Sequence, residues 1–87
     1  MKINHEQQKL IDEMLTKLKD RYPEIVFDSL QPSADNPEDI WVNITADMDE
    51  EREIELHSYA AQLSMDILME TDYSILLLID NPSRVYA

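Results

Sequence analysis

Between residues 40 and 45 the chain reads Ile40-Trp41-Val42-Asn43-Ile44-Thr45. Apolar residues at every second position predict a β-strand with Ile40, Val42 and Ile44 on one face. The alternate residues, from Trp41 to Thr45, then lie on the opposite face. Residues 74–79 read Ser-Ile-Leu-Leu-Leu-Ile, an unbroken apolar run that predicts a central strand covered on both faces.

Helical periodicity predicts one helix before this stretch and another after it. Asn4 and Gln7 form a capping box for the first helix, which spans about residues 5–21 and ends before Pro23. A second capping box, Asp47 with Glu50, starts a helix that runs to about residue 70. The expected buried residues of the first helix are Leu10, Ile11, Met14, Leu15, Leu18 and Tyr22. Those of the second helix are Ile54, Leu56, Ala60, Ala61, Leu63, Ile67 and Leu68.

Residues 24–30 are rich in β-branched and aromatic residues and predict the first strand, whereas residues 31–39 contain two prolines and predict a loop. The element order is therefore α-β-β-α-β, in a single domain over residues 1–87. The second and third strands are joined by a helix and should run parallel. We expect an α+β fold of two layers, with a three-stranded mixed sheet and both helices on one face.

The composition excludes several classes of site. The chain has no glycine, although ordinary usage of about 7 % would give roughly six. The P-loop, the dinucleotide fingerprint, the nucleophile elbow and the glycine-rich RNA-clamping loop are therefore excluded. Disulfides and cysteine-based zinc sites are excluded as well, because there is no cysteine. No apolar run approaches the roughly 18 residues of a membrane span, and we expect a cytoplasmic, prokaryotic protein.

The net charge of −12 is unevenly placed along the chain. Thirteen acidic residues lie between Asp28 and Asp72 against Arg52 alone, so this segment carries all of the net charge. Such a field repels nucleic acid and anionic membranes and attracts a basic partner. The alternative interpretation is that the acidity only maintains solubility.

Two segments are of interest, Asp28-Ser29-Leu30 and Asp39-Ile40-Trp41-Val42. In its element order the chain resembles the minimal nucleotidyltransferase fold, where these two places hold a Gly-Ser turn and an Asp-x-Asp metal pair. Here no glycine precedes Ser29, and Trp41 takes the place of the second aspartate, so the resemblance implies a version without a working site. The element order also resembles the type II KH arrangement, but the Gly-x-x-Gly loop is missing and the acidity argues against RNA. Residues 39–68 are further similar to small acidic prokaryotic proteins to which no activity is assigned.

The leading functional hypothesis is a non-enzymatic protein-interaction module, comparable to an antitoxin, an immunity protein or an inhibitor. Trp41 is the expected aromatic anchor for a protein partner, which the acidity suggests is basic. Charge complementarity is expected from Asp49, Glu50, Glu53 and His57. We expect no catalytic residue, cofactor or bound metal, and no nucleic-acid or membrane partner.

A homodimer is also expected, because two helices cover one face of a three-stranded sheet and leave the other face apolar. Trp41, either Val26 or Leu30, and alternate residues of the last strand would form that interface. Two alternatives stay open. A terminal tail could cover Trp41, or the chain could be a purely structural homodimer whose acidity serves solubility.

A different class of function, an enzyme or a metal-dependent regulator, would use carboxylates and a histidine. Its residues would be Asp35, Glu38, Asp39, Glu53 and His57. This alternative predicts that the five side chains converge on one pocket. For Glu53 and His57 the simpler interpretation is a pair of neighbours on an exposed helix.

Overall fold

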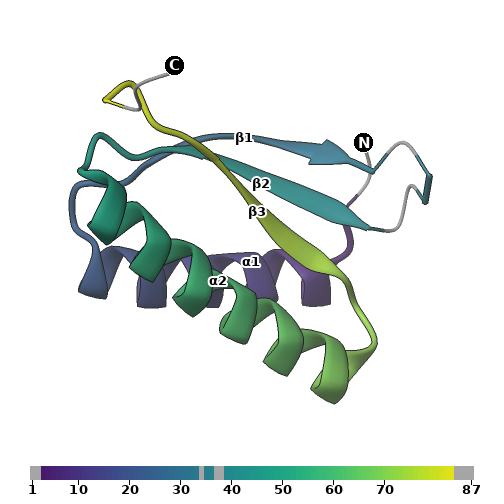
Figure 1. Cartoon of the computed structure of the whole chain (residues 1–87). Coiled ribbons are helices and arrows are strands. Elements are labelled where there is room, and N and C mark those ends of the chain that lie inside the picture. The colour runs from purple at the N-terminus through teal and green to yellow at the C-terminus, as the bar shows by residue number, and fades with distance from the viewer. Residues whose placement is uncertain (1–2, 34, 37–38, 84–87) are drawn as a thin grey trace.

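The computed structural model describes residues 3–33, 35–36 and 39–83. Two helices and three strands follow one another as α-β-β-α-β, which confirms the predicted order and the α+β class (Figure 1). The elements are α1 (His5–Arg21), β1 (Val26–Pro32), β2 (Ile40–Thr45), α2 (Glu50–Thr71) and β3 (Ile75–Asp80).

The strands form one mixed sheet in the order β1-β2-β3. β1 pairs with β2 antiparallel, and β2 pairs with β3 parallel, as predicted for strands joined through a helix. The prediction that residues 74–79 form a central strand is wrong, because β2 is central and β3 lies at an edge. The apolar run of β3 arises because its residues are apolar on both sides of the sheet, although among the residues that the structure describes only the helix side is covered. Ile75 and Ile79 are buried toward the helices, whereas Leu78 on the other side is 49 % exposed.

β1 forms the opposite edge and lies two residues further along the chain than predicted. Gln31 and Pro32, expected in a loop, pair with the start of β2. An edge strand tolerates proline because the missing N–H need not enter the ladder. The register shifts between Phe27 and Ser29, so Asp28 forms a bulge. A bulge, a charged residue and a proline all discourage the addition of another strand at this edge.

α1 has the predicted boundaries because both of its ends are fixed by local hydrogen bonds. The Asn4 side chain accepts from the backbone N–H of Gln7 at 2.7 Å, and the Gln7 side chain accepts from the Asn4 N–H at 3.1 Å. At the other end Tyr22 leaves helical geometry before Pro23 and donates its N–H to the Leu18 carbonyl at 2.7 Å. This confirms the capping box and the proline stop.

The core lies between the sheet and the two helices, which Figure 1 shows on the same side of the sheet. The predicted alternation on β2 is confirmed, since Ile40, Val42 and Ile44 are buried and the residues between them are half-buried. Helix residues complete the same cluster, namely Ile11, Met14, Leu18, Leu56, Ala60 and Leu63. Within the described residues the other face of the sheet carries no helix.

α2 ends with Asp72 in the left-handed region, at φ 64° and ψ 6°. The Asp72 N–H donates to the Leu68 carbonyl at 2.9 Å and closes the helix. Glycine is the usual residue in this conformation, but the short polar side chain of aspartate tolerates it. Asp72 is the one non-glycine residue with positive φ among those described.

Candidate functional site

The start of α2 is capped by Asp49. Its carboxylate accepts from the backbone N–H of Arg52 at 2.8 Å, which satisfies one of the free amides of the first turn. The prediction that Asp47 is the cap is wrong, because the chain stays extended for two more residues. The Asp47 carboxylate instead accepts a hydrogen bond from the hydroxyl of Ser83.

Three glutamates follow in the first turn of α2, where the helix dipole favours negative charge. Glu50 and Glu51 are exposed, whereas the side chain of Glu53 is only 13 % exposed. His57 lies one turn further along the helix, with its Nε2 3.5 Å from the Glu53 carboxylate. The histidine side chain is 55 % exposed. The simpler interpretation of Glu53 and His57 as helix neighbours therefore describes their geometry.

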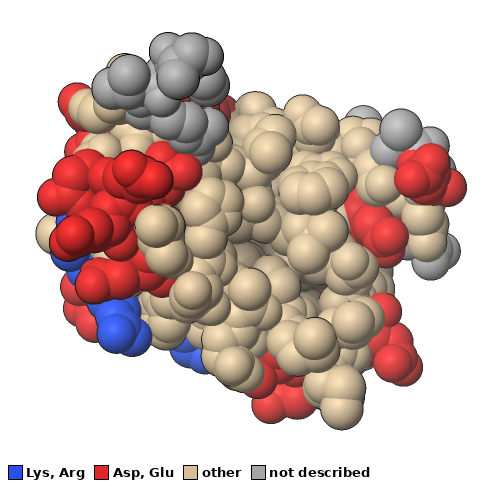
Figure 2. All heavy atoms as spheres, viewed as in Figure 1, with Lys and Arg blue, Asp and Glu red and all other residues tan. Residues whose placement is uncertain are grey.

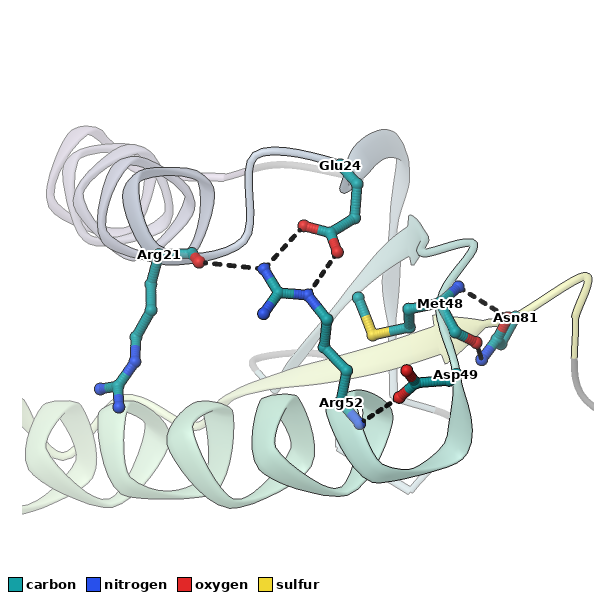
Figure 3. Close-up of polar contacts among 6 residues, drawn as sticks. All are labelled: Arg21, Glu24, Met48, Asp49, Arg52 and Asn81. Carbon is teal, nitrogen blue, oxygen red and sulfur yellow. Dashed lines mark hydrogen bonds and ion pairs between the residues drawn. The ribbon is translucent and has the colours of Figure 1, made fainter.

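Asn81 ties the end of β3 to the start of α2 and is only 4 % exposed (Figure 3). Its amide nitrogen donates to the Met48 carbonyl at 2.9 Å and to the Glu53 carboxylate at 2.6 Å. Its amide oxygen accepts from the N–H groups of Met48 at 3.4 Å and Ser83 at 3.0 Å. The side chain thus pairs with Met48 as a further strand residue would. Glu53 is held inside this network and is less accessible to a partner than Glu50.

Arg52 connects the start of α2 to the end of α1 (Figure 3). Its guanidinium donates to both carboxylate oxygens of Glu24, from Nε to one and from Nη2 to the other at 3.0 Å. Nη2 also donates to the Arg21 carbonyl at 3.3 Å. The guanidinium carbon also lies 4.7 Å from the centre of the Tyr22 ring. The hydrogen bond from Arg52 lowers the pKa of the Glu24 carboxyl and raises the pKa of Arg52. Arg52 therefore pairs with a carboxylate outside α2.

The largest group of acidic side chains lies at the left of the visible surface, next to basic residues, and smaller acidic groups lie at the right and lower edges (Figure 2). Between them is a broad central area without charged residues. α2 contributes to this imbalance with six acidic residues against Arg52. A surface hollow at the start of α2 is lined by both acidic and uncharged residues. They are Met48, Asp49, Glu50, Glu53, Ile54, Asn81 and Ser83. An apolar area with a charged border is typical of a protein-binding surface.

α2 is apolar on two opposite faces, and only one of them is buried. The prediction of core positions for Ile54, Ala61 and Leu68 is wrong. Ile54 is 58 % exposed, Leu68 is 41 % exposed and Ala61 is also exposed. These three residues recur every seven positions and so follow one line along the helix. The inner face consists of Leu56, Ala60 and Leu63, with Ile67 half-buried beside them.

Two methionines widen the exposed line, since Met65 is 54 % exposed and Met69 is 77 % exposed. Together, five residues form what we call the outer stripe, namely Ile54, Ala61, Met65, Leu68 and Met69. The sequence signal for this surface was present, because α2 has more apolar positions than one helix face can hold. Periodicity alone does not say which of the two faces meets the sheet.

The helix-free face of the sheet is a second uncovered surface, on which apolar side chains lie beside polar ones. Trp41 is half-buried on this face, and Val26 and Leu78 are 55 % and 49 % exposed. Leu30, the alternative to Val26, pairs with Val42 and lies on the helix side. The predicted tail that would cover Trp41 includes residues 84–87, which lie outside the described residues.

Asn43 lies at the centre of the helix-free face. Its amide nitrogen donates to Ser29 Oγ and to Gln31 Oε1, both at 3.0 Å. Its amide oxygen is buried and has no hydrogen-bond partner in the part of the chain that the structure describes. A buried acceptor without a partner costs free energy, so this oxygen lowers the stability of the fold.

The structure does not bring together the residues of the enzyme or metal alternative. Asp35 and Asp39 precede β2, whereas Glu53 and His57 lie on α2, which follows the other end of that strand. Glu38 lies outside the described residues. Across residues 3–33, 35–36 and 39–83, no three acidic or histidine side chains are arranged to hold a metal ion.

Over the same described residues, neither helix combines the length and the hydropathy needed to cross a membrane. The resemblance to the minimal nucleotidyltransferase fold remains a prediction. No protein-family model matches the chain, and searches of curated proteins and of solved structures give no significant match.

Proposed function

We propose that the protein is a non-enzymatic interaction module that binds a basic protein partner, in the manner of an antitoxin, an immunity protein or an inhibitor. The observation that carries this proposal is the separation of acidic side chains from a charge-free area on one surface (Figure 2). Acidic groups speed the encounter with a basic partner. The uncharged area supplies the surface from which water is expelled on binding.

Among the residues predicted to bind the partner, Glu50 and His57 have exposed side chains and fit the proposal best. Glu51 joins them as an exposed neighbour in the same turn. Asp49 caps the helix, and Glu53 bonds to Asn81, so both also maintain the fold.

The test reverses charge at the proposed surface and, in a matched control, elsewhere. One variant carries Glu50→Lys and Glu51→Lys, and the control carries Glu13→Lys and Asp20→Lys on exposed positions of α1. Both variants change the net charge equally. The immobilised chain captures proteins from a native extract, and binding of the purified partner is then measured at rising salt concentration.

We expect the α2 variant to weaken binding by about ten-fold or more and the α1 variant to change it by less than about three-fold. The affinity of the unmodified chain should fall as salt screens the charges. Equal binding by the two variants, or a partner with no excess of basic residues, would show that the proposal is wrong.

A structural homodimer is the second candidate, and the exposed apolar side chains of Val26 and Leu78 on the helix-free face favour it. Trp41 is the only tryptophan, so its fluorescence reports directly on this face. Self-association should shift the emission to shorter wavelength as protein concentration rises, and sedimentation should give twice the monomer mass. A monomer at high micromolar concentration would refute this candidate.

A further inference from the structure

We infer that the outer stripe of α2 is the docking site for a basic amphipathic helix of the partner. This inference rests on the proposed function and adds to it the contact surface and the form of the partner. It concerns a different surface from the helix-free face of the sheet that carries Trp41.

The spacing of the outer stripe suits a helix. Ile54, Ala61, Met65 and Leu68 are separated by seven, four and three residues, the pattern that a second helix meets along one line. From Ile54 to Leu68 the stripe is about 21 Å long, at 1.5 Å for each helical residue. Ala61 near the middle lets another backbone approach closely, and the flexible side chains at Met65 and Met69 adapt to a partner's shape. A helix of four turns covers the whole stripe.

Acidic residues border the stripe at both ends. Glu50 and Glu51 lie one turn before Ile54, and Asp72 lies one turn after Leu68. All three acidic side chains are exposed. An incoming helix therefore meets mainly apolar side chains along its middle, with the exposed polar residues His57 and Ser58 between Ile54 and Ala61, and negative charge at both of its ends. The complementary helix has apolar residues at the same spacing and lysine or arginine on either side of them.

A second copy of the chain fits the same surface less well. Ile54 and Leu68 are each seven residues from Ala61, so antiparallel pairing about Ala61 would bring them together. The same pairing would place Glu50 opposite Asp72 at both ends. The one base on α2 is engaged with a glutamate outside the helix and does not offset this repulsion. Charge complementarity thus favours a basic partner over self-association.

The experiment uses a synthetic peptide of three heptads, about 21 residues, with leucine at the first and fourth positions and lysine or alanine elsewhere. A scrambled peptide of the same composition has the same charge without the apolar line. The two protein variants are Ala61→Glu, on the stripe, and Thr16→Glu, at an exposed position of α1. Both add one negative charge, and glutamate is a good helix former at either position. Circular dichroism and thermal melting verify that both variants fold.

If the inference is correct, the patterned peptide binds more tightly than the scrambled one. Ala61→Glu weakens its binding by about ten-fold or more, although the added charge should attract a basic peptide, and Thr16→Glu changes it by less than about two-fold. Backbone amide shifts on binding should map to residues 54–69.

Four results would overturn the inference. Equal binding of both peptides, or of both variants, would mean that attraction is purely electrostatic. Amide shifts around Trp41 would place the docking site on the sheet and leave the proposed function intact. A dimer that Ala61→Glu dissociates would make a second copy the occupant. Absence of peptide binding also refutes the docking site. The proposed function is then tested separately, by the charge-reversal experiment with the purified partner.

Discussion

Replacing Asn81 by alanine should destabilise the protein more than any other single change to a polar side chain described above. The substitution removes both hydrogen bonds that the amide nitrogen donates, to the Met48 carbonyl and to the Glu53 carboxylate. It also removes the acceptor for the backbone N–H groups of Met48 and Ser83. The link between β3 and α2 is therefore lost at one point.

The cost follows from the burial of these groups. A hydrogen bond to a carboxylate contributes roughly 1.5–3 kcal/mol and one to a neutral carbonyl roughly 1 kcal/mol. Water reaches part of this site and recovers some of the loss, because the Glu53 side chain is 13 % exposed. We therefore expect Asn81→Ala to lower the free energy of unfolding by about 2–3 kcal/mol. For a domain of this size, that corresponds to a fall in Tm of roughly 10–20 °C.

Urea unfolding followed by circular dichroism measures the difference. Gln62→Ala is the matched control, since it removes an amide whose hydrogen bond, to Asp66, lies on the exposed surface of α2. Asn81→Asp tests the assignment of the donor. It keeps the shape of the side chain but places a second carboxylate beside Glu53. The loss of stability that Asn81→Asp causes should therefore become smaller at acid pH. Stability of Asn81→Ala within about 0.5 kcal/mol of the unmodified protein would refute this account of the link.

Four further substitutions test other parts of the fold. Leu56→Ala on the inner face of α2 should cost about 2–5 kcal/mol in urea unfolding, whereas Ile54→Ala on the outer stripe should stay within about 0.5 kcal/mol; equal losses would contradict the two-faced helix. Asp72→Gly should raise the stability by about 0.5–1 kcal/mol, because glycine adopts a positive φ without strain, and a fall in Tm would argue against the left-handed cap. Glu24→Gln should be less stable than the unmodified protein above pH 4.5, because the bond to Arg52 lowers the pKa of Glu24 in the folded state. This difference in stability should disappear as the pH falls through that lowered pKa. A gap that persists unchanged in acid would mean that the ion pair does not contribute.

The local features of the fold could be predicted from the sequence because they depend on neighbouring residues. The capping box of Asn4 and Gln7, the proline stop after Tyr22 and the alternation on β2 are each specified within a few positions. The cap of α2 was misplaced by two residues because Asp47 and Asp49 are both acceptable cap residues. Only the course of the chain before the helix distinguishes them.

The long-range features could not be predicted in the same way. An apolar run such as that of β3 looks the same at the centre of a sheet and at an edge covered by its own helix layer. The outer and inner faces of α2 both satisfy helical spacing, so Ile54 and Leu68 were assigned to the core. Asn81 stands directly before a proline and suggested only the end of a strand. Its contact with Met48, 33 residues earlier, becomes visible only in three dimensions.

The absence of glycine has a thermodynamic consequence for the unfolded chain. Among the described residues φ is positive at Asp72 alone, and there glycine would be the more stable residue. At positions of negative φ, a residue other than glycine restricts the denatured ensemble, which raises stability by about 0.4–1 kcal/mol per position. For the roughly six glycines that a chain of ordinary composition would carry, the total is about 2–6 kcal/mol, beside a typical folding stability of about 5–15 kcal/mol. A sizeable part of the stability of this small domain thus comes from conformations that its disordered chain never samples.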